Sequence, residues 1–251
     1  KQVGIPKAFT KAYPVALTGI NPRDEFQVIC FESNNAAFFA KRIVLVEGDS
    51  DLIAFPHVAH VLEPSWNCRS HSVAFVRVGG KNSFARYRSF FKRFDVPVFI
   101  IADLDALLDG FDKLEPSSAA KNLQSKLVQV IDECNEKDRA VTTVKTDDIK
   151  QAHSSHELRQ LWNAVKAAKQ VYERDKTAIA ELDAAVDAFF AWEKKNIRRD
   201  CLQQAKHPSV RQAKLDLIWE LRRHKVFVLE QGALDDYYPA HISGPDKPSK
   251  A

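Results

Sequence analysis

Short apolar runs that stop at acidic residues or glycines predict the strands in the first half of the chain. Each run has five or six residues, is rich in valine and isoleucine, and shows no polar alternation. Such a run is typical of a strand buried on both faces, as in a parallel sheet. The runs are Arg42–Val46, Val73–Val78 and Pro97–Ala102.

Helical patterns separate these runs. Ser50 is a predicted N-cap for an apolar helix over Asp51–Leu62, in which Pro56 makes the first turns irregular. A second helix begins after Asn82 or Ser83 and runs to Phe94, with aromatic residues at helical spacing. Three strand–helix units in series favour a parallel, doubly wound sheet.

Residues 113–224 change to an almost purely helical pattern with few glycines. An apolar strand-like run returns at Val226–Leu229, so the helices are predicted to be an insertion in the α/β fold. The fold class we predict is therefore α/β, a doubly wound parallel sheet with an inserted all-α helical domain. The predicted helices are Ser117–Glu136, Ser154–Asp175, Lys176–Arg199 and Pro208–His224.

The expected domains follow from these changes in pattern. Residues 41–112 and 225–242 form the α/β domain, and residues 113–224 form the helical insertion with a short strand at Val141–Val144. Residues 1–40 are a lead-in segment that contains a strand at Phe26–Phe31 and a short helix at Asn34–Lys41. The tail 243–251 is rich in Pro, Lys and Ser and is expected to be disordered.

Composition narrows the class of protein. The 251 residues are 28% charged with a net charge of +4, and no apolar stretch is long enough to cross a membrane. Four widely spaced cysteines favour reduced thiols in a cytoplasmic protein over a disulfide framework or a zinc site. The chain begins with Lys1 and contains no methionine, so we expect it to be a fragment of a longer protein.

Acidic residues follow the predicted strands. Glu47 follows the first strand, Asp103 and Asp105 follow the third, and Asp235 and Asp236 come after the last. Ligands of open α/β sheets bind at the carboxyl ends of the strands, where so many carboxylates repel one another unless cations intervene. Oxygen ligands suit Mg²⁺ or Mn²⁺, and two such ions roughly 3.5–4 Å apart support phosphoryl displacement.

Basic residues supply candidates for phosphate contact. Lys81 follows Gly79-Gly80, where the backbone can approach a phosphate closely, and Lys225 precedes the last strand. The helical region holds 21 Lys and Arg against 17 Asp and Glu. Paired arginines at predicted helix C-termini are candidate DNA contacts, although the helix dipole also stabilises cations there. They are Arg198, Arg199, Arg222 and Arg223.

The acidic motifs resemble those of the Toprim domain, and in finer detail those of the OLD (overcoming lysogenization defect) nucleases. The similar segments are Phe38–Gly48 with Asp51, Val78–Lys81, Ala102–Ala106 and Gly232–Tyr238. The OLD family couples an N-terminal ABC-type ATPase to a C-terminal Toprim nuclease. No G-x-x-x-x-G-K-[ST] phosphate loop occurs in this chain, so the resemblance implies the Toprim part without the ATPase.

The resemblance implies two metal ions, Mg²⁺ or Mn²⁺, with Ca²⁺ as a non-productive occupant. Glu47 and Asp51 are expected to hold one ion, and Asp103 and Asp105 the other. A late acid completes the shell: Asp235 stands where relatives often have Glu, so Asp236 or Glu230 is an alternative. Glu47, Asp103, Lys81 and Lys225 form the expected catalytic set.

We therefore expect a metal-dependent DNA endonuclease that acts by a two-metal mechanism. Its expected partners are DNA and the parent's own N-terminal ATPase domain, with a homodimer as an open alternative and no membrane. The alternative functions are another Toprim activity and a non-catalytic DNA-binding or assembly module. A haloacid-dehalogenase-type phosphatase is disfavoured, since Leu107 stands where that pattern has Thr and Glu47 would have no role.

Overall fold

The computed structural model describes residues 32–139 and 156–239, which fall into two compact units. Unit 1 comprises Lys1–Pro116 and Leu221–Ala251, and unit 2 comprises Ser117–Glu220. The strands expected at Phe26–Phe31 and Val141–Val144 and the expected disordered tail 243–251 lie outside the described residues.

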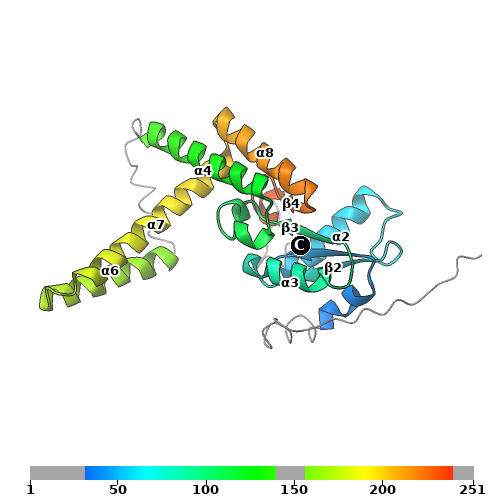
Figure 1. Ribbon diagram of the computed structural model, residues 1–251, viewed down its shortest axis with the longest axis horizontal. Coiled ribbons are helices and arrows are strands. Elements are labelled where there is room, and N and C mark those ends of the chain that lie inside the picture. Colours follow the sequence, from blue (N-terminus) through cyan, green and yellow to red (C-terminus); the bar gives the residue numbers. More distant parts are fainter. Residues whose placement is uncertain (1–31, 140–155, 240–251) are drawn as a thin grey trace, which may run out of the picture. The chain divides into compact units, whose positions relative to one another are not determined.

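The described part of unit 1 is built on a four-stranded parallel sheet with the order β2-β1-β3-β4 (Figure 1). Val44 in β1 pairs with Phe75 in β2 and Phe99 in β3, and Ile100 pairs with Val226 in β4. The predicted doubly wound parallel sheet is confirmed. The strands are β1 (Arg42–Val46), β2 (Val73–Arg77), β3 (Val98–Ala102) and β4 (Val226–Val228).

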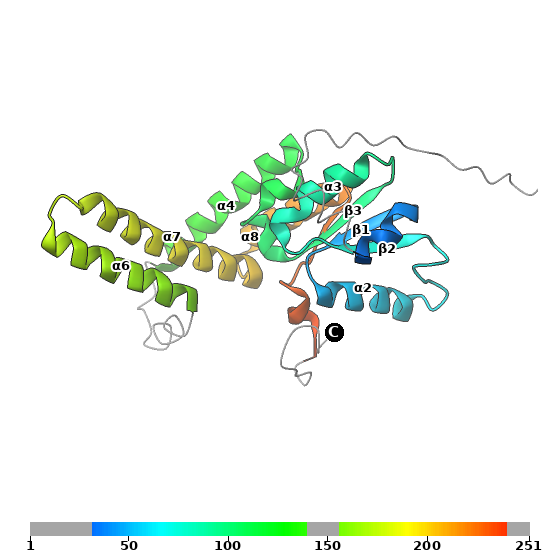
Figure 2. The same cartoon turned by 90° about the horizontal axis from the view of Figure 1, so that it is seen from below.

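The sheet holds the core of unit 1. Ile43, Leu45 and Val46 of the central strand β1 are fully buried, as expected for a parallel strand covered on both faces. Figure 2 shows helices α2 (Asp49–Leu62) and α3 (Phe84–Lys92) on opposite sides of the sheet. This placement follows from the strand order, because right-handed crossovers from β1 to β2 and from β2 to β3 put their helices on opposite faces.

Aromatic packing fixes the segment before β1. Residues Glu32–Phe39 form a 3₁₀ helix, η1, where the sequence predicted a short helix at Asn34–Lys41. The Phe38 ring lies 6.2 Å from the Phe90 ring and 5.6 Å from the Phe94 ring, centroid to centroid. Aromatic residues of α3 and of the turn after it therefore pack against η1 through Phe38.

Short 3₁₀ helices follow the strand ends. The turns that carry the residues of the candidate site therefore have regular hydrogen-bonded structure. They are η2 (Lys81–Ser83) after β2, η3 (Leu104–Leu107) and η4 (Phe111–Leu114) after β3, and η5 (Leu234–Tyr237) after β4.

The described residues of unit 2 form helices joined by short connections. The Trp162 and Phe189 rings, 5.5 Å apart, join α6 to α7, and the fully buried Leu127 and Ile131 form the inner face of α4. Helix α7 runs five residues past its predicted end at Arg199, so Arg198 and Arg199 do not lie at a helix C-terminus as expected. The helices are α4 (Ser118–Arg139), α6 (His156–Arg174), α7 (Ile179–Gln204) and α8 (Pro208–Arg223), whose last three residues belong to unit 1.

Two further expectations concern the described ranges as a whole. Over residues 32–139 and 156–239, no helix has both the length and the apolar character that a membrane span needs. Within the same ranges, Cys68, Cys134 and Cys201 form no disulfide bond.

Candidate metal centre

The carboxyl ends of β1, β2 and β3 meet at one edge of the sheet. Glu47 directly follows β1, and the neighbouring strand β3 leads into Asp103 and Asp105. The turn after β2 closes on the same point, because the backbone N–H groups of Gly79 and Gly80 each donate to the Glu47 carbonyl at 3.2 Å. Lys81, the next residue, is thereby placed beside the acids.

Gly80 makes this turn possible and gives a first prediction. Its φ of +112° with ψ of 148° is backbone that only glycine adopts easily, while a Cβ there would meet no atom within 4 Å. We expect Gly80→Ala to lower the free energy of unfolding by about 1–3 kcal/mol through backbone strain alone. Gly48→Ala is the matched control, since Gly48 has a φ of −132° and its Cβ would lie 3.8 Å from the Asp51 carboxylate. Chemical denaturation of both variants measures the difference, and equal stabilities would contradict the strain.

Lys81 is held between two carboxylates. Its Nζ lies 2.7 Å from Asp105 Oδ2 and 3.1 Å from Asp109 Oδ2, and its side chain is 15% exposed. Burial lowers the pKa of the Lys81 ammonium, but the hydrogen bonds and charges of Asp105 and Asp109 outweigh burial, so the pKa lies above its ordinary value. The ammonium is therefore a permanent positive charge inside the acidic cluster.

Glu47 is the acid with the most constrained carboxylate. Its Oε2 is buried without a hydrogen-bond partner among the described residues, while the Lys81 backbone N–H bonds the carboxylate. Burial raises the pKa of Glu47, as do the charges of Asp105 and Asp51, against the opposing effect of Lys81. The structure thus brings Glu47, Asp51, Asp105 and Lys81 within electrostatic reach of one another.

Asp51 has a structural task as well. Its Oδ2 accepts the Gly48 backbone N–H at 2.9 Å, which ties the first turn of α2 to the end of β1. Gly48, not Ser50, is the N-cap of this helix, and the helix begins at Asp49. The prediction of a Ser50 cap was wrong because the Asp51 carboxylate, three residues after Gly48, closes the turn from inside the helix.

Asp103 lies at the same edge and links it to the late motif. It follows the buried Ala102 at the end of β3, and its carbonyl accepts the Ala106 N–H at 3.1 Å to start η3. The next residue, Leu104, donates its N–H to the Gly232 carbonyl at 2.9 Å. The Gly232–Tyr238 motif therefore starts beside the Asp103 turn.

The late acids differ in what they contact. The Asp236 carboxylate accepts the Ala233 N–H at 2.7 Å and caps η5, whereas Asp235 lies half-buried within that helix. Glu230 forms an ion pair with Arg222 at 2.7 Å. Of the three proposed late ligands, Asp236 and Glu230 thus use their carboxylates to hold local structure, and Asp235 lies in the same 3₁₀ helix as Asp236.

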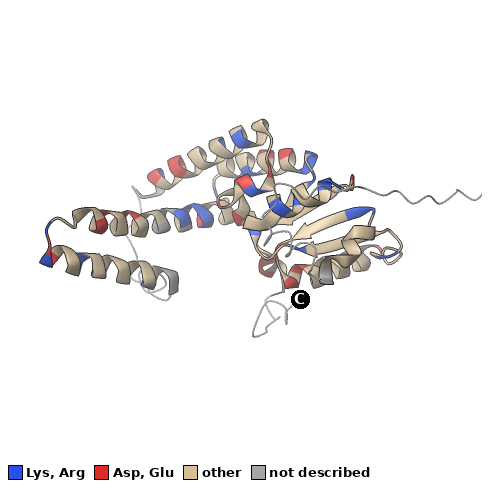
Figure 3. Ribbon diagram, turned by 60° about the horizontal axis from the view of Figure 1, so that its bottom comes forward, with Lys and Arg blue, Asp and Glu red and all other residues tan. Residues whose placement is uncertain are grey.

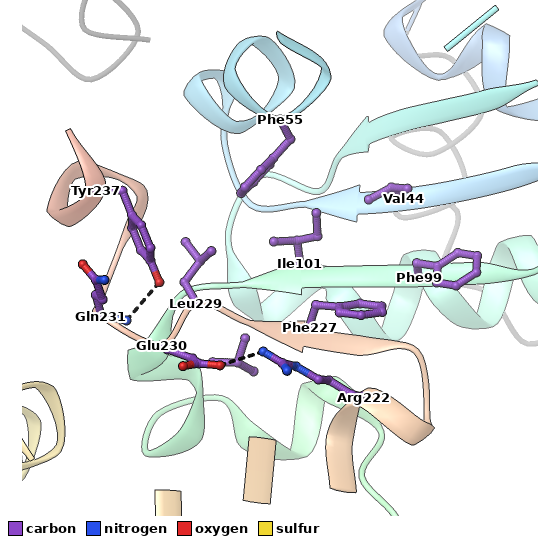
Figure 4. A pocket seen from close by; sticks show the side chains of 11 residues that line it. Val44, Phe55, Phe99, Ile101, Arg222, Phe227, Leu229, Glu230, Gln231 and Tyr237 are labelled. Atoms are coloured by element: carbon purple, nitrogen blue, oxygen red, sulfur yellow. Dashed lines mark hydrogen bonds and ion pairs between the residues drawn. The ribbon is translucent and has the colours of Figure 1, made fainter. Parts of the chain in front are cut away.

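The Glu230–Arg222 pair lines an apolar pocket on one face of the sheet, shown in Figure 4. The pocket has a volume of about 590 Å³, and most of its lining comes from strand and helix side chains such as Phe55, Ile101 and Phe227. None of Glu47, Asp51, Asp103, Asp105 and Lys81 lines it. The pocket and the acidic edge are separate features of unit 1.

Lys225 lies at the wrong end of the sheet for the expected catalytic role. It precedes β4, and its carbonyl accepts the Ile100 N–H, so it stands at the amino end of a parallel strand. Its ammonium lies 5.5 Å from the centroid of the Phe99 ring, a cation–π contact. Since the acids follow the carboxyl ends, we remove Lys225 from the catalytic set.

The four arginines expected to bind DNA have different surroundings. Arg198 donates to both carboxylate oxygens of Asp132, and Arg222 pairs with Glu230. Arg199 is half-buried, and Arg223 is exposed at the end of α8. Figure 3 shows acidic and basic residues interspersed along the helices of unit 2. The excess of positive charge is thus partly neutralised by local ion pairs.

The donor set fits a hard divalent cation, although the ligands are not converged on one point. Glu47, Asp51 and Asp105 offer oxygen atoms only, and the buried Glu47 Oε2 lacks a partner. Within the described residues, no group of three His, Cys, Asp or Glu side chains is arranged to hold a metal ion. Two of these acids have other partners, since Lys81 pairs with Asp105 and the Gly48 N–H donates to Asp51 Oδ2.

Residues 38–105 match the sequence profile of a family described as overcoming lysogenization defect protein-like, Toprim domain. The chain carries an OLD-like Toprim domain. The match covers β1, β2 and β3 and ends at Asp105, so it includes the acids at the carboxyl edge.

Two solved structures are also similar to this chain. The C-terminal region of the Xanthomonas campestris pv. campestris OLD protein is 14% identical, with a TM-score of 0.27, and the match covers 76% of this chain and 100% of that one. The C-terminal region of the Burkholderia pseudomallei OLD protein is 15% identical, with a TM-score of 0.26 and coverage of 73% and 100%. No curated protein sequence matched.

Asp109, which the sequence analysis did not single out, is a second partner of Lys81. The Asp109 N–H donates to the Asp105 carbonyl at 2.9 Å, and this turn points both carboxylates at Lys81. The spacing of four residues between the two acids is the signal that could have found it.

Proposed function

We propose that the OLD-like Toprim domain is a divalent-metal-dependent DNA endonuclease. The observation that carries the proposal is the half-buried Glu47 carboxylate, whose buried Oε2 has no hydrogen-bond partner among the described residues and which feels the charge of Asp105 at the end of the adjacent strand. Like charges held close together in a partly buried place destabilise a fold, so such an arrangement is typical of a functional site. The family match supports a Toprim role for this edge.

Glu47 and Asp51 would hold one ion, and Asp103 and Asp105 a second, with Asp235 as the late ligand. When bound, Mg²⁺ or Mn²⁺ would supply an activated water and charge stabilisation for phosphodiester hydrolysis, whereas Ca²⁺ would occupy the site without productive chemistry. The residues of the chain would position the substrate. Lys81 would place its ammonium near the scissile phosphate.

DNA is the substrate that we propose, and the parent's ATPase domain is the partner that would couple nucleotide hydrolysis to cleavage. Arg199, Arg222 and Arg223 would contribute phosphate contacts together with the remaining basic residues. A homodimer would present two such acidic edges. A non-catalytic Toprim module is the second candidate, favoured by the ion pair that already occupies Asp105.

Nicking of supercoiled plasmid DNA tests this proposal directly. We expect nicked and linear products with Mg²⁺ or Mn²⁺, no product with EDTA, and no product with Ca²⁺ alone. Chelator-resistant cleavage would contradict metal dependence. DNA binding without cleavage in either metal would favour the non-catalytic module.

A further inference from the structure

Lys81 places a positive charge among the carboxylates at the carboxyl edge of the sheet. Its ammonium contacts two carboxylates, yet these differ in their relation to Glu47. Asp105 follows β3 at the edge where Glu47 follows the neighbouring strand β1, whereas Asp109 lies one turn further along the chain. Asp105 is one of the proposed metal ligands, and Asp109 flanks it.

We propose that Lys81 is a tethered cation that competes with the divalent ion for Asp105, and that Asp109 is the positioning residue that retains Lys81 when the ion binds. This inference rests on the proposed metal centre. Metal binding is then an exchange of one cation for another at Asp105, with Lys81 kept beside the site on Asp109.

The geometry allows this exchange without movement of the backbone. The Lys81 Nζ already lies within hydrogen-bond distance of both carboxylates, at 2.7 and 3.1 Å. Loss of the Asp105 contact leaves the Asp109 contact in place, and an ammonium has three donors to distribute. Only the end of the side chain has to shift.

The surrounding loops hold the Lys81 stem in this position. The Gly79-Gly80 turn fixes its backbone against Glu47, and Gly110 lies over its side chain. A Cβ at Gly110 would lie 3.5 Å from Lys81 Cγ and 3.6 Å from Cδ, and the φ of +84° there favours glycine. A lysine packed in this way on two sides is a fixed part of the site rather than a solvated surface cation.

The exchange has two consequences. Without metal, Lys81 offsets the repulsion between carboxylates, so the acidic edge stays folded. With metal, the Lys81 donor released from Asp105 becomes available beside the ion, where a phosphate would sit. Asp109 would thus act through Lys81 and touch neither metal nor substrate.

Mn²⁺ titration of the full chain by calorimetry, without DNA, tests the inference separately from cleavage. Lys81→Met removes the competitor, and we expect it to bind Mn²⁺ roughly tenfold more tightly, which is about 1.4 kcal/mol. Asp109→Asn leaves Lys81 on Asp105 alone, and we expect severalfold weaker binding. Asp49→Asn is the matched control, because it removes an exposed acid of the same edge that pairs with Arg77 instead, and it should bind as wild type.

The double variant Lys81→Met with Asp109→Asn shows whether Asp109 changes Mn²⁺ affinity through its contact with Lys81 or through its negative charge alone. If Asp109 acts through Lys81, Asp109→Asn should change Mn²⁺ affinity little in the Lys81→Met background. An equal loss in both backgrounds, or no gain from Lys81→Met, would overturn the inference. If Lys81→Met does not fold, the comparison of Asp109→Asn with Asp49→Asn decides. Equal Mn²⁺ affinities of these two variants would then overturn the inference.

The same titration distinguishes the two proposals. A wild-type chain that binds no Mn²⁺ would overturn the metal centre and with it the proposed function. A wild-type chain that binds Mn²⁺ and cleaves DNA, with no coupling between Lys81 and Asp109, would overturn only the exchange.

Discussion

Replacing Glu47 by glutamine is expected to abolish metal-dependent cleavage and to make the metal-free domain more stable. The glutamine keeps the size of the side chain and removes a half-buried carboxylate whose pKa is raised by the charges of Asp105 and Asp51. Loss of a charge that stabilises the reaction lowers turnover by at least roughly a hundredfold. Loss of the same charge relieves repulsion in the folded state, so activity and stability should move in opposite directions.

The pH dependence of that stability has a definite sign. Burial raises the pKa of Glu47 above its ordinary value of 4.5, so the folded state binds the proton more tightly than the unfolded state. In the wild type, this contribution to stability is present below pH 4.5 and is lost as the pH rises through the folded-state pKa. Glu47→Gln has no such loss.

Thermal unfolding in EDTA at a series of pH values measures the difference. We expect the melting temperature of Glu47→Gln to exceed that of the wild type by a margin that grows from about pH 4.5 and then levels off. Adding Mn²⁺ should raise the melting temperature of the wild type only. Wild-type cleavage by the variant, or a margin that shrinks with rising pH, would contradict the role of Glu47.

The strands and the acids at their ends could be predicted from the sequence because both depend on local pattern. The apolar run Arg42–Val46 has to be buried, and Glu47 then has to stand at the edge of the sheet. Contacts between distant segments leave no such pattern. The pairing of Lys81 with Asp105 and Asp109 depends on how the β2 turn closes on Glu47, and that is a property of the folded sheet.

The ends of elements are harder to predict. Lys225 precedes the parallel strand β4, so it lies at the opposite end of the sheet from the acids that follow the strands. Helix α7 was expected to stop at Arg199, although no helix breaker follows before the left-handed Ala205. Local sequence predicts the type of a secondary-structure element better than it predicts where the element ends or which segments pack against it.

The longer α7 changes what is expected of its arginines. Arg198 lies within the helix and donates to both oxygens of Asp132 in α4, the first at 2.7 Å. The two side chains are 28% and 30% exposed, so the pair is partly screened by solvent. Arg198→Gln should lower the free energy of unfolding of unit 2 by about 1–2 kcal/mol, because it leaves a half-buried carboxylate without its charged donor.

Arg223 is expected to matter for DNA binding and not for stability, because it is exposed at the end of α8. Arg223→Gln should leave stability nearly unchanged and weaken DNA binding for all sequences alike. Each lost phosphate contact reduces the slope of log K against log salt by roughly 0.9. We therefore expect a flatter slope for Arg223→Gln and an unchanged slope for Arg198→Gln, measured by fluorescence anisotropy in Ca²⁺ at several salt concentrations.

The pair of variants separates a packing role from a DNA-binding role. A flatter slope for Arg198→Gln would mean that Arg198 leaves Asp132 for a phosphate, and the fixed ion pair would then be the wrong description. An unchanged slope for Arg223→Gln would remove Arg223 from the DNA-binding surface. Neither result would alter the acids at the carboxyl edge of the sheet, since their chemistry depends on residues that neither substitution touches.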